Sequence, residues 1–162
     1  MEMYIHRPLA EEDLERICTF PQSAEELFYM SPRAKFPLTP EQILELRKGR
    51  YDPTVIVEES TGRVAAYANI YDAGEEVCWL GNVIVSPEYR GKGAAEALIR
   101  AMLRLAKENH GAKRLLLSCH NTNSRGLAFY HKHGFRPFDI RISTLDDGRR
   151  MITIQMEKET GH

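Results

Sequence analysis

The chain contains one short stretch whose residue types and spacing suit the binding of a phosphate group, Arg90 to Ala95, which reads RGKGAA. Its glycines and alanines carry no bulky side chain, so a ligand can approach the backbone closely. A helix is predicted to begin here, and the first N–H groups of a helix are unpaired and carry partial positive charge. Arg90 and Lys92 add two cations. The chemistry that we expect at this stretch is the binding of a pyrophosphate.

The elements on either side would position this stretch. Val83 to Val85 is an unbroken run of β-branched residues, typical of a strand that is covered on both faces, and Pro87 ends it. After the glycines, apolar residues recur at the spacing of one helical face. They are Ala95, Leu98, Ile99, Met102 and Ala106. The sequence therefore predicts a strand, a glycine turn and a helix.

Two common phosphate-binding motifs do not fit the turn. A dinucleotide-binding fingerprint needs a third glycine, where this chain has Glu96, and an acidic residue about 20 positions on, where it has Gly111 to Lys113. A Walker A loop needs serine or threonine after its lysine, and Gly93 follows Lys92 instead.

A third pattern, Arg-x-x-Gly-x-Gly/Ala after a strand, is met by Arg90, Gly93 and Ala95. It resembles the coenzyme A signature of the GNAT superfamily of N-acetyltransferases. A second motif, Asn123 and Tyr130 seven residues apart and then Gly134-Phe135, is similar to that family's Asn-x-x-Ala-x-x-x-Tyr followed by Gly-Phe. Gly126 replaces the usual alanine and still admits a ligand close to the helix. The resemblance covers Thr54 to Ile142.

This resemblance implies an acetyl-CoA site between two diverging parallel strands. The strand backbone would hold the pantetheine arm, the turn would take the pyrophosphate, and Asn123 would hydrogen-bond the pantetheine. The amine would attack the thioester directly in a ternary complex, a backbone N–H would stabilise the oxyanion, and Tyr130 would protonate the thiolate as general acid. The cofactor-binding residues so implied are Val83, Ile84, Val85, Arg90, Gly91, Lys92, Gly93, Ala94, Ala95, Asn123 and Tyr130.

Each of these residues also has a plainer interpretation. Tyr130 could pack among apolar neighbours, Arg90 and Lys92 could be solvated turn residues, and Asn123 could be only a helix N-cap, a role for which Asn121 competes. His131 and His133 point to different sides of a helix and cannot chelate a metal, so no metal site is expected.

Neighbouring strand residues alternate between faces, which argues against Cys119 and His120 as a nucleophile pair.

The general base stays unassigned. Glu75 and Glu76, which precede the strand starting at Val77, compete with a water held by Asn82 or by backbone carbonyls.

The family places the acceptor between the N-terminal helices and the last hairpin. Acidic and aromatic residues there would suit a small cationic primary amine. They are Glu25, Glu26, Phe28, Tyr29, Phe36, Tyr71 and Trp79. A peptide N-terminus or a lysine side chain is an alternative acceptor, and a non-catalytic coenzyme A sensor is an alternative function.

Length and composition limit the class of protein. The 162 residues predict one domain, 1–162, and a net charge of −1 gives no electrostatic reason to expect nucleic acid or an anionic membrane. No apolar run approaches the ~20 residues of a membrane span. The three scattered cysteines and the acidic N-terminus predict a cytoplasmic protein, either a monomer or a homodimer.

The remaining pattern predicts a single α+β domain with a mixed, mostly antiparallel sheet, a central splayed parallel strand pair and flanking helices. Strands are expected over 3–7, 54–58, 63–71, 77–85, 114–119, 135–143 and 151–157. Helices are expected over 10–18, from 23 towards 29, over 39–48, from the glycine turn to about 109, and over 123–133.

Overall fold

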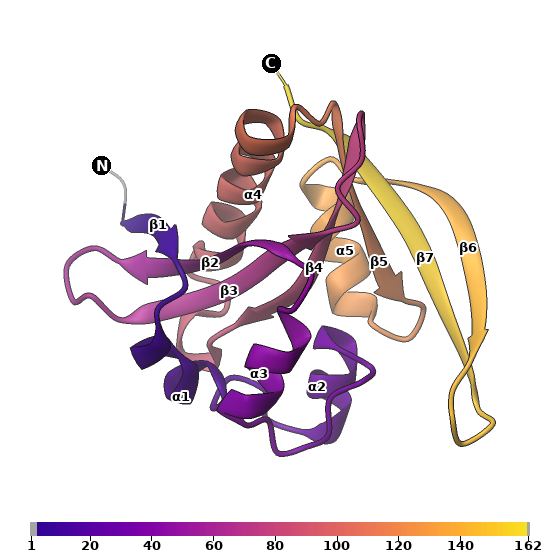
Figure 1. Ribbon diagram of the computed structural model, residues 1–162, viewed down its shortest axis with the longest axis horizontal. Helices are drawn as coiled ribbons and strands as arrows, with labels where there is room; N and C mark the ends of the chain where they lie inside the picture. Colours follow the sequence, from indigo (N-terminus) through magenta and orange to yellow (C-terminus); the bar gives the residue numbers. More distant parts are fainter. Residues whose placement is uncertain (1–2, 162) are drawn as a thin grey trace.

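The computed structural model describes residues 3–161, and its centre is one mixed sheet of seven strands in the order β1-β2-β3-β4-β5-β7-β6 (Figure 1). All neighbouring strands are antiparallel except β4 and β5. The strands are β1 (Tyr4–Pro8), β2 (Tyr51–Glu58), β3 (Val64–Tyr71), β4 (Val77–Val85), β5 (Arg114–His120), β6 (Arg136–Thr144) and β7 (Arg150–Glu159). The helices are α1 (Leu14–Ile17), α2 (Ala24–Met30), α3 (Pro40–Leu46), α4 (Ala94–His110) and α5 (Ser124–Lys132), with single 3-10 turns at Glu11–Asp13 and Pro87–Tyr89.

The sheet separates two hydrophobic cores. Strand β3 shows how: Ala66, Ala68 and Ile70 join the core beneath α4, whereas Tyr67 joins the core beneath α1–α3. This division follows from the alternation of side chains along a strand. Figure 1 shows α4 and α5 on one side of the sheet and α1, α2 and α3 on the other. Each face of the sheet is therefore covered by its own set of helices.

Polar side chains cap the starts of α2 and α3. Ser23 accepts from the backbone N–H of Glu26, and Thr39 accepts from that of Gln42, with Pro40 in the first helical position. The Gln42 side chain hydrogen-bonds the backbone of Lys35 and Pro37. These bonds tie α3 to the segment that precedes it.

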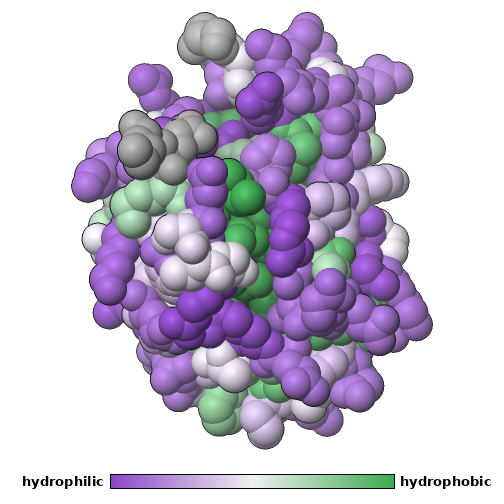
Figure 2. All heavy atoms as spheres, turned by 90° about the vertical axis from the view of Figure 1, so that its left-hand side faces the viewer, coloured by the Kyte–Doolittle hydropathy of each residue, from purple (hydrophilic) through white to green (hydrophobic). Residues whose placement is uncertain are grey.

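The predicted fold class, an α+β domain with a mixed sheet, is confirmed, including the central parallel pair. Figure 2 looks onto the left-hand side of the molecule as Figure 1 draws it, and hydrophilic side chains dominate that surface around a narrow hydrophobic band. Among residues 3–161, no helix has the length and apolar character needed to cross a membrane.

Candidate active site at the splayed strands

The parallel strands β4 and β5 separate part-way along their length. Their pairing runs from Val77–Arg114 to Leu80–Leu117, and β4 then continues to Val85 alongside β3 alone. Strand β4 has one extra residue between the pairs Asn69–Gly81 and Tyr67–Ile84, which forms a bulge. Asn82 in this bulge adopts a left-handed φ of 52°. The bulge bends β4 away from β5, so the expected splay near Val83 is present and opens a cleft between them.

A buried polar network fixes this bulge. The Asn69 side chain donates to Asn82 Oδ1 at 2.9 Å and to the Tyr67 hydroxyl at 3.0 Å, and Asn82 Nδ2 donates to the Met30 carbonyl oxygen at 3.1 Å. Because its amide is bonded on both ends, Asn82 is a poor candidate for holding a catalytic water. The network instead locks β3, the bulge and the end of α2 together.

The N-terminus of α4 opens towards the same cleft. Gly91 and Gly93 have φ values of 73° and 90°, a left-handed conformation that side-chain-bearing residues rarely adopt. Among residues 3–161 no side chain caps α4, whereas Ser23, Thr39 and Asn123 cap α2, α3 and α5. The first amides of α4 are thus left for a ligand.

Arg90 lines the cleft with its guanidinium paired to Glu26 of α2. The two Nη–Oε distances are 2.6 and 3.4 Å, and both side chains are about 30% exposed. This partner holds the pKa of Glu26 below its ordinary value. The pair joins the α4 turn to α2 and neutralises one of the acidic side chains that the sequence suggested for the acceptor.

Helix α5 brings Tyr130 to the other side of the splay. Asn123 is its N-cap, as its side chain accepts from the Gly126 N–H at 3.0 Å. Tyr130 lines the cleft, and no described residue hydrogen-bonds its hydroxyl. Burial raises the pKa of Tyr130 above its ordinary value, with Cys119 as a smaller cause. Tyr130 thus offers a protonated, unpartnered hydroxyl at the cleft.

The sequence itself decides the family. A profile of the acetyltransferase (GNAT) family matches residues 16–135, which is most of the chain. The chain belongs to this family. The matched region includes the splayed strands, the uncapped start of α4 and Tyr130, so the GNAT resemblance expected from the two motifs is confirmed.

Curated relatives match this GNAT protein over parts of their length. An uncharacterized N-acetyltransferase of Mycobacterium tuberculosis (strain ATCC 25618 / H37Rv) is 32% identical over 82 residues, 51% of this chain and 52% of the relative. The glucosamine 6-phosphate N-acetyltransferase of Trypanosoma brucei brucei is 30% identical over 94 residues, 54% of this chain and 61% of the relative. YobR of Bacillus subtilis (strain 168), an uncharacterized N-acetyltransferase, is 41% identical over 58 residues. This match covers 36% of this chain and 23% of the relative. The chain therefore spans from about a quarter to three fifths of these relatives.

Solved structures share the whole fold of this GNAT chain. The Vibrio cholerae spermidine N-acetyltransferase in complex with CoA and spermine has a TM-score of 0.79 at 16% identity, covering 98% of this chain and 96% of that one. The ribosomal-protein-S18-alanine N-acetyltransferase of Escherichia coli has a TM-score of 0.72 at 23% identity, covering 99% and 96%. At such identities the likeness establishes the fold. The two acceptors differ, so the fold leaves the acceptor open.

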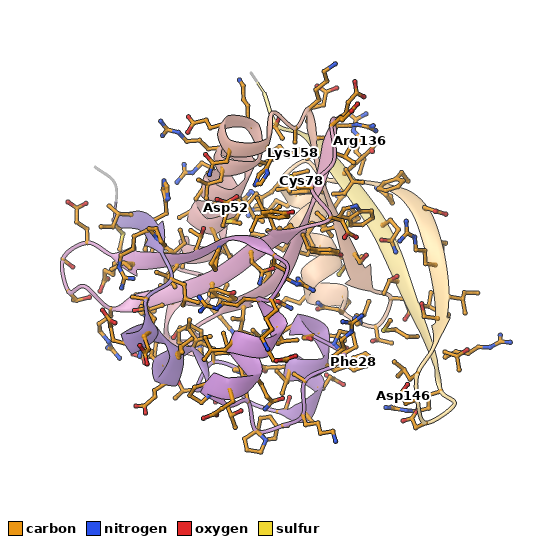
Figure 3. The ribbon with its side chains drawn as sticks, viewed as in Figure 1. Phe28, Asp52, Cys78, Arg136, Asp146 and Lys158 are labelled. Atoms are coloured by element: carbon orange, nitrogen blue, oxygen red, sulfur yellow. The ribbon has the colours of Figure 1, made fainter. Side chains whose placement is uncertain are left out.

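GNAT enzymes use acetyl-CoA, and the residues of this chain fit that group. The cleft measures about 1510 Å³, larger than the ~300–1,000 Å³ of ordinary ligand pockets. It runs from the α4 turn to the β6–β7 hairpin, and two of its lining residues are labelled in Figure 3, Phe28 on α2 and Asp146 at the turn between β6 and β7. It can hold a cofactor and an acceptor together.

Most of the predicted site residues meet in this cleft. Of the residues predicted for the cofactor, Val83, Ile84, Val85, Arg90, Gly91, Ala95, Asn123 and Tyr130 line it; of those predicted for the acceptor, Glu25, Glu26, Phe28, Tyr29, Phe36 and Tyr71 do. Lys92, Gly93, Ala94 and Trp79 are not part of the lining. Trp79 packs near Tyr71 with Arg141 over its ring, and Glu76 pairs with Lys113 at the opposite end of β4.

His120, at the end of β5, is a site residue that sequence reasoning missed. It is 6% exposed, lines the cleft, and its ring lies edge-on to those of Phe28 and Tyr29 at 4.6 and 5.6 Å. Its Nδ1 is buried with no hydrogen-bond partner in the described part of the chain. Burial lowers the pKa of His120 below its ordinary value, so the imidazole is neutral at pH 7. The available signal was a histidine that ends a strand whose centre is the apolar run Leu115–Leu117.

Proposed function

We propose that the protein is an N-acetyltransferase that moves an acetyl group from acetyl-CoA to a primary amine of a small molecule, with both substrates bound at once. The observation that carries this proposal is the single cleft joining the uncapped start of α4, the splayed edge of β4, Tyr130 and His120. Acetyl-CoA supplies an activated thioester at this cleft.

The cofactor half would bind by backbone groups more than by side chains. The exposed edge of Val83–Val85 would pair with the pantetheine amides as one more strand. The amides of Gly91, Gly93 and Ala94 would hold the pyrophosphate at the positive end of α4. Lys92 adds a cation at the turn, and the Asn123 amide, whose oxygen already caps α5, has N–H groups left for the pantetheine.

Tyr130 would serve as the general acid. Its raised pKa keeps the hydroxyl protonated at neutral pH, and its lack of a protein partner leaves that proton available to the departing thiolate. A backbone N–H at the β4 bulge would stabilise the negative charge that develops on the acetyl oxygen.

His120 would serve as the general base. It lies three residues beyond Leu117, the last residue of β5 that pairs with β4, so it stands where the two strands have separated. Alternation along β5 sends Cys119 to the core beneath α5 and His120 to the opposite face, where it meets α2. Acid and base would therefore approach the thioester from opposite faces of the sheet.

His120→Gln is expected to lower kcat/KM at pH 7 by roughly 10²-fold, because the bound ammonium loses its proton acceptor. The wild-type kcat/KM should decline once the pH drops below the pKa of His120, because the imidazole accepts the substrate proton only when it is neutral. Burial places this decline at a pH lower than the ordinary histidine value of 6.5. The kcat/KM of the variant should lack this acidic limb, and it should change with pH only through the ionisation of the amine substrate. The measurement is kcat/KM against pH.

The control for this experiment is His6→Gln, which changes an exposed histidine of β1 and should leave the profile unaltered. An unchanged acidic limb in the His120 variant would show that the proton leaves by another route.

A small acceptor is favoured because elements enclose its half of the cleft on several sides. Helix α2, residues 31–36 and the turn between β6 and β7 all contribute to the lining. The names of two similar proteins, acting on glucosamine 6-phosphate and on spermidine, support an amine acceptor. The name of the Escherichia coli neighbour keeps a protein N-terminus as the alternative acceptor.

The test is a thiol-release assay with acetyl-CoA and a panel of amino acids, amino sugars, polyamines and peptides, with products identified by mass spectrometry. Transfer is expected to at least one small primary amine, with one CoA released for each acetyl amide formed. Thermal stabilisation by acetyl-CoA with no amide from any acceptor would favour the sensor instead.

A further inference from the structure

A half-buried arginine lies on the floor of the acceptor half of the cleft. Arg50, just before β2, extends over β3, where its Nη1 donates to Asn69 Oδ1 at 2.9 Å and its guanidinium lies 4.4 Å from the centre of the Tyr71 ring. Asn69 and Tyr71 belong to the sheet face that carries Tyr67, opposite the face covered by α4. Arg50 is therefore on the acceptor side, across the sheet from the expected pyrophosphate site.

Gly81 of β4 makes room for this guanidinium. A Cβ at position 81 would overlap Arg50 Nη1 and would lie 2.8 Å from Tyr71 Cδ1. The backbone of Gly81 is not left-handed, so its conformation does not require a glycine. The glycine is needed because a side chain there would occupy the space of the arginine. Gly81 is adjacent to the Asn82 bulge, so the cation is held beside the splay where the chemistry is expected.

In the described part of the chain, no carboxylate forms a salt bridge with Arg50. Its contacts, Asn69 and Tyr71, are neutral. Burial lowers the pKa of Arg50 below its ordinary value; the like-charged Arg33 adds to this effect, and Asp72 opposes it. A partly desolvated guanidinium without a contacting carboxylate is costly unless a ligand supplies an anionic partner.

The rest of the acceptor half is also positive. Its basic lining residues are Arg33, Lys35, Arg50, Arg141 and Arg149, and its acidic ones are Glu25, Glu26, Asp146 and Asp147. Asp147 is already paired with Arg149 at 2.7 Å, and Glu26 is paired with Arg90. The balance favours an anionic group over the purely cationic acceptor that the acidic residues suggested from sequence.

We propose that the acceptor is a primary amine that also carries an anionic oxygen group, a carboxylate or a phosphate, and that this group pairs with Arg50. The inference rests on the proposed acetyl transfer and specifies its substrate class. A guanidinium presents a planar fork of N–H donors, which matches carboxylate and phosphate oxygens. Asn69 occupies one Nη of Arg50 and leaves the other nitrogen atoms for the substrate.

The experiment compares acceptors that differ only in the anionic group. L-Alanine is paired with L-alaninamide to test a carboxylate, and glucosamine 6-phosphate is paired with glucosamine to test a phosphate. Values of kcat/KM are corrected for the unprotonated fraction of each amine. In at least one pair the anionic member should be preferred by roughly 10–100-fold, the worth of a charged hydrogen-bonded contact.

Arg50→Met keeps an unbranched stem over Tyr71 and removes the charge. It should bring that preference to near unity, mainly through KM, while the neutral member keeps nearly its wild-type kcat/KM. Arg50→Lys should restore part of the preference. Arg47→Met, which removes an exposed arginine outside the cleft lining, should preserve it in full.

Two results would overturn the inference while leaving acetyl transfer intact. One is equal or better use of the neutral members, or of spermidine, by the wild type. The other is an equal loss for both members of a pair in Arg50→Met, which would assign Arg50 a structural role. Absence of acetylated product from every acceptor, with CoA still bound, would overturn the proposed function and this inference together.

Discussion

Tyr130→Phe is expected to lower kcat by roughly 10²–10⁴-fold while leaving the affinity for acetyl-CoA nearly unchanged. The substitution removes only a hydroxyl that no described residue hydrogen-bonds, so the packing of the ring on Phe129 and Phe135 should survive. The thermal midpoint should therefore hardly move. The measurement is kcat under saturating substrates, with cofactor affinity from calorimetry.

Two observations would separate acid catalysis from other causes. Tyr51→Phe removes a hydroxyl from a ring that packs on His110, outside the cleft, and should leave kcat within about twofold of wild type. A similarly small change in Tyr130→Phe would mean that the thiolate takes its proton from water. Single-turnover kinetics must accompany a small effect, because slow product release can hide a slower chemical step.

Ala95→Glu is expected to weaken the binding of acetyl-CoA by roughly 10³-fold, the worth of two or more charged hydrogen bonds lost to the phosphates. Ala95 lies in the first turn of α4 and lines the cleft. A glutamate there places bulk and negative charge where the pyrophosphate is expected. The same charge is favourable at a helix N-terminus, so the domain should remain folded.

This position tests the site better than its glycines do. Gly93 has a φ of 90°, so any side chain there strains the backbone as well as filling the site. Ala95→Gln has nearly the size of the glutamate without its charge and should fall between the wild type and Ala95→Glu. Unchanged affinity in Ala95→Glu, measured by calorimetry on a folded variant, would show that the pyrophosphate binds elsewhere.

The fold could be predicted because local signals agree with the final structure. The run Val83–Val85, the glycine turn and the helical spacing after it each specify one element, and Ser23, Thr39 and Asn123 mark helix starts as capping residues. The two motifs then placed Tyr130 and the α4 turn at the same cleft. Such features depend on short stretches of chain, which a sequence displays directly.

The remaining features depend on contacts between distant residues. The Arg90–Glu26 pair joins residues 64 positions apart, and the fit of Arg50 over Gly81 needs the register of β3 and β4. His120 was considered only as a partner for Cys119, and strand alternation rightly separates these two. What sequence could not show is that α2 would pack its aromatic rings against that histidine.

The central claim is that one cleft holds acetyl-CoA and the amine at the same time and passes the acetyl group directly between them. Initial velocities, measured with both substrates varied, test it most directly once the acceptor panel has identified a substrate. The account predicts double-reciprocal lines that intersect, and an intact protein mass that is unchanged after incubation with acetyl-CoA alone. Parallel lines together with an acetylated protein would contradict it, because they would show that the acetyl group is attached covalently to the enzyme before the amine binds.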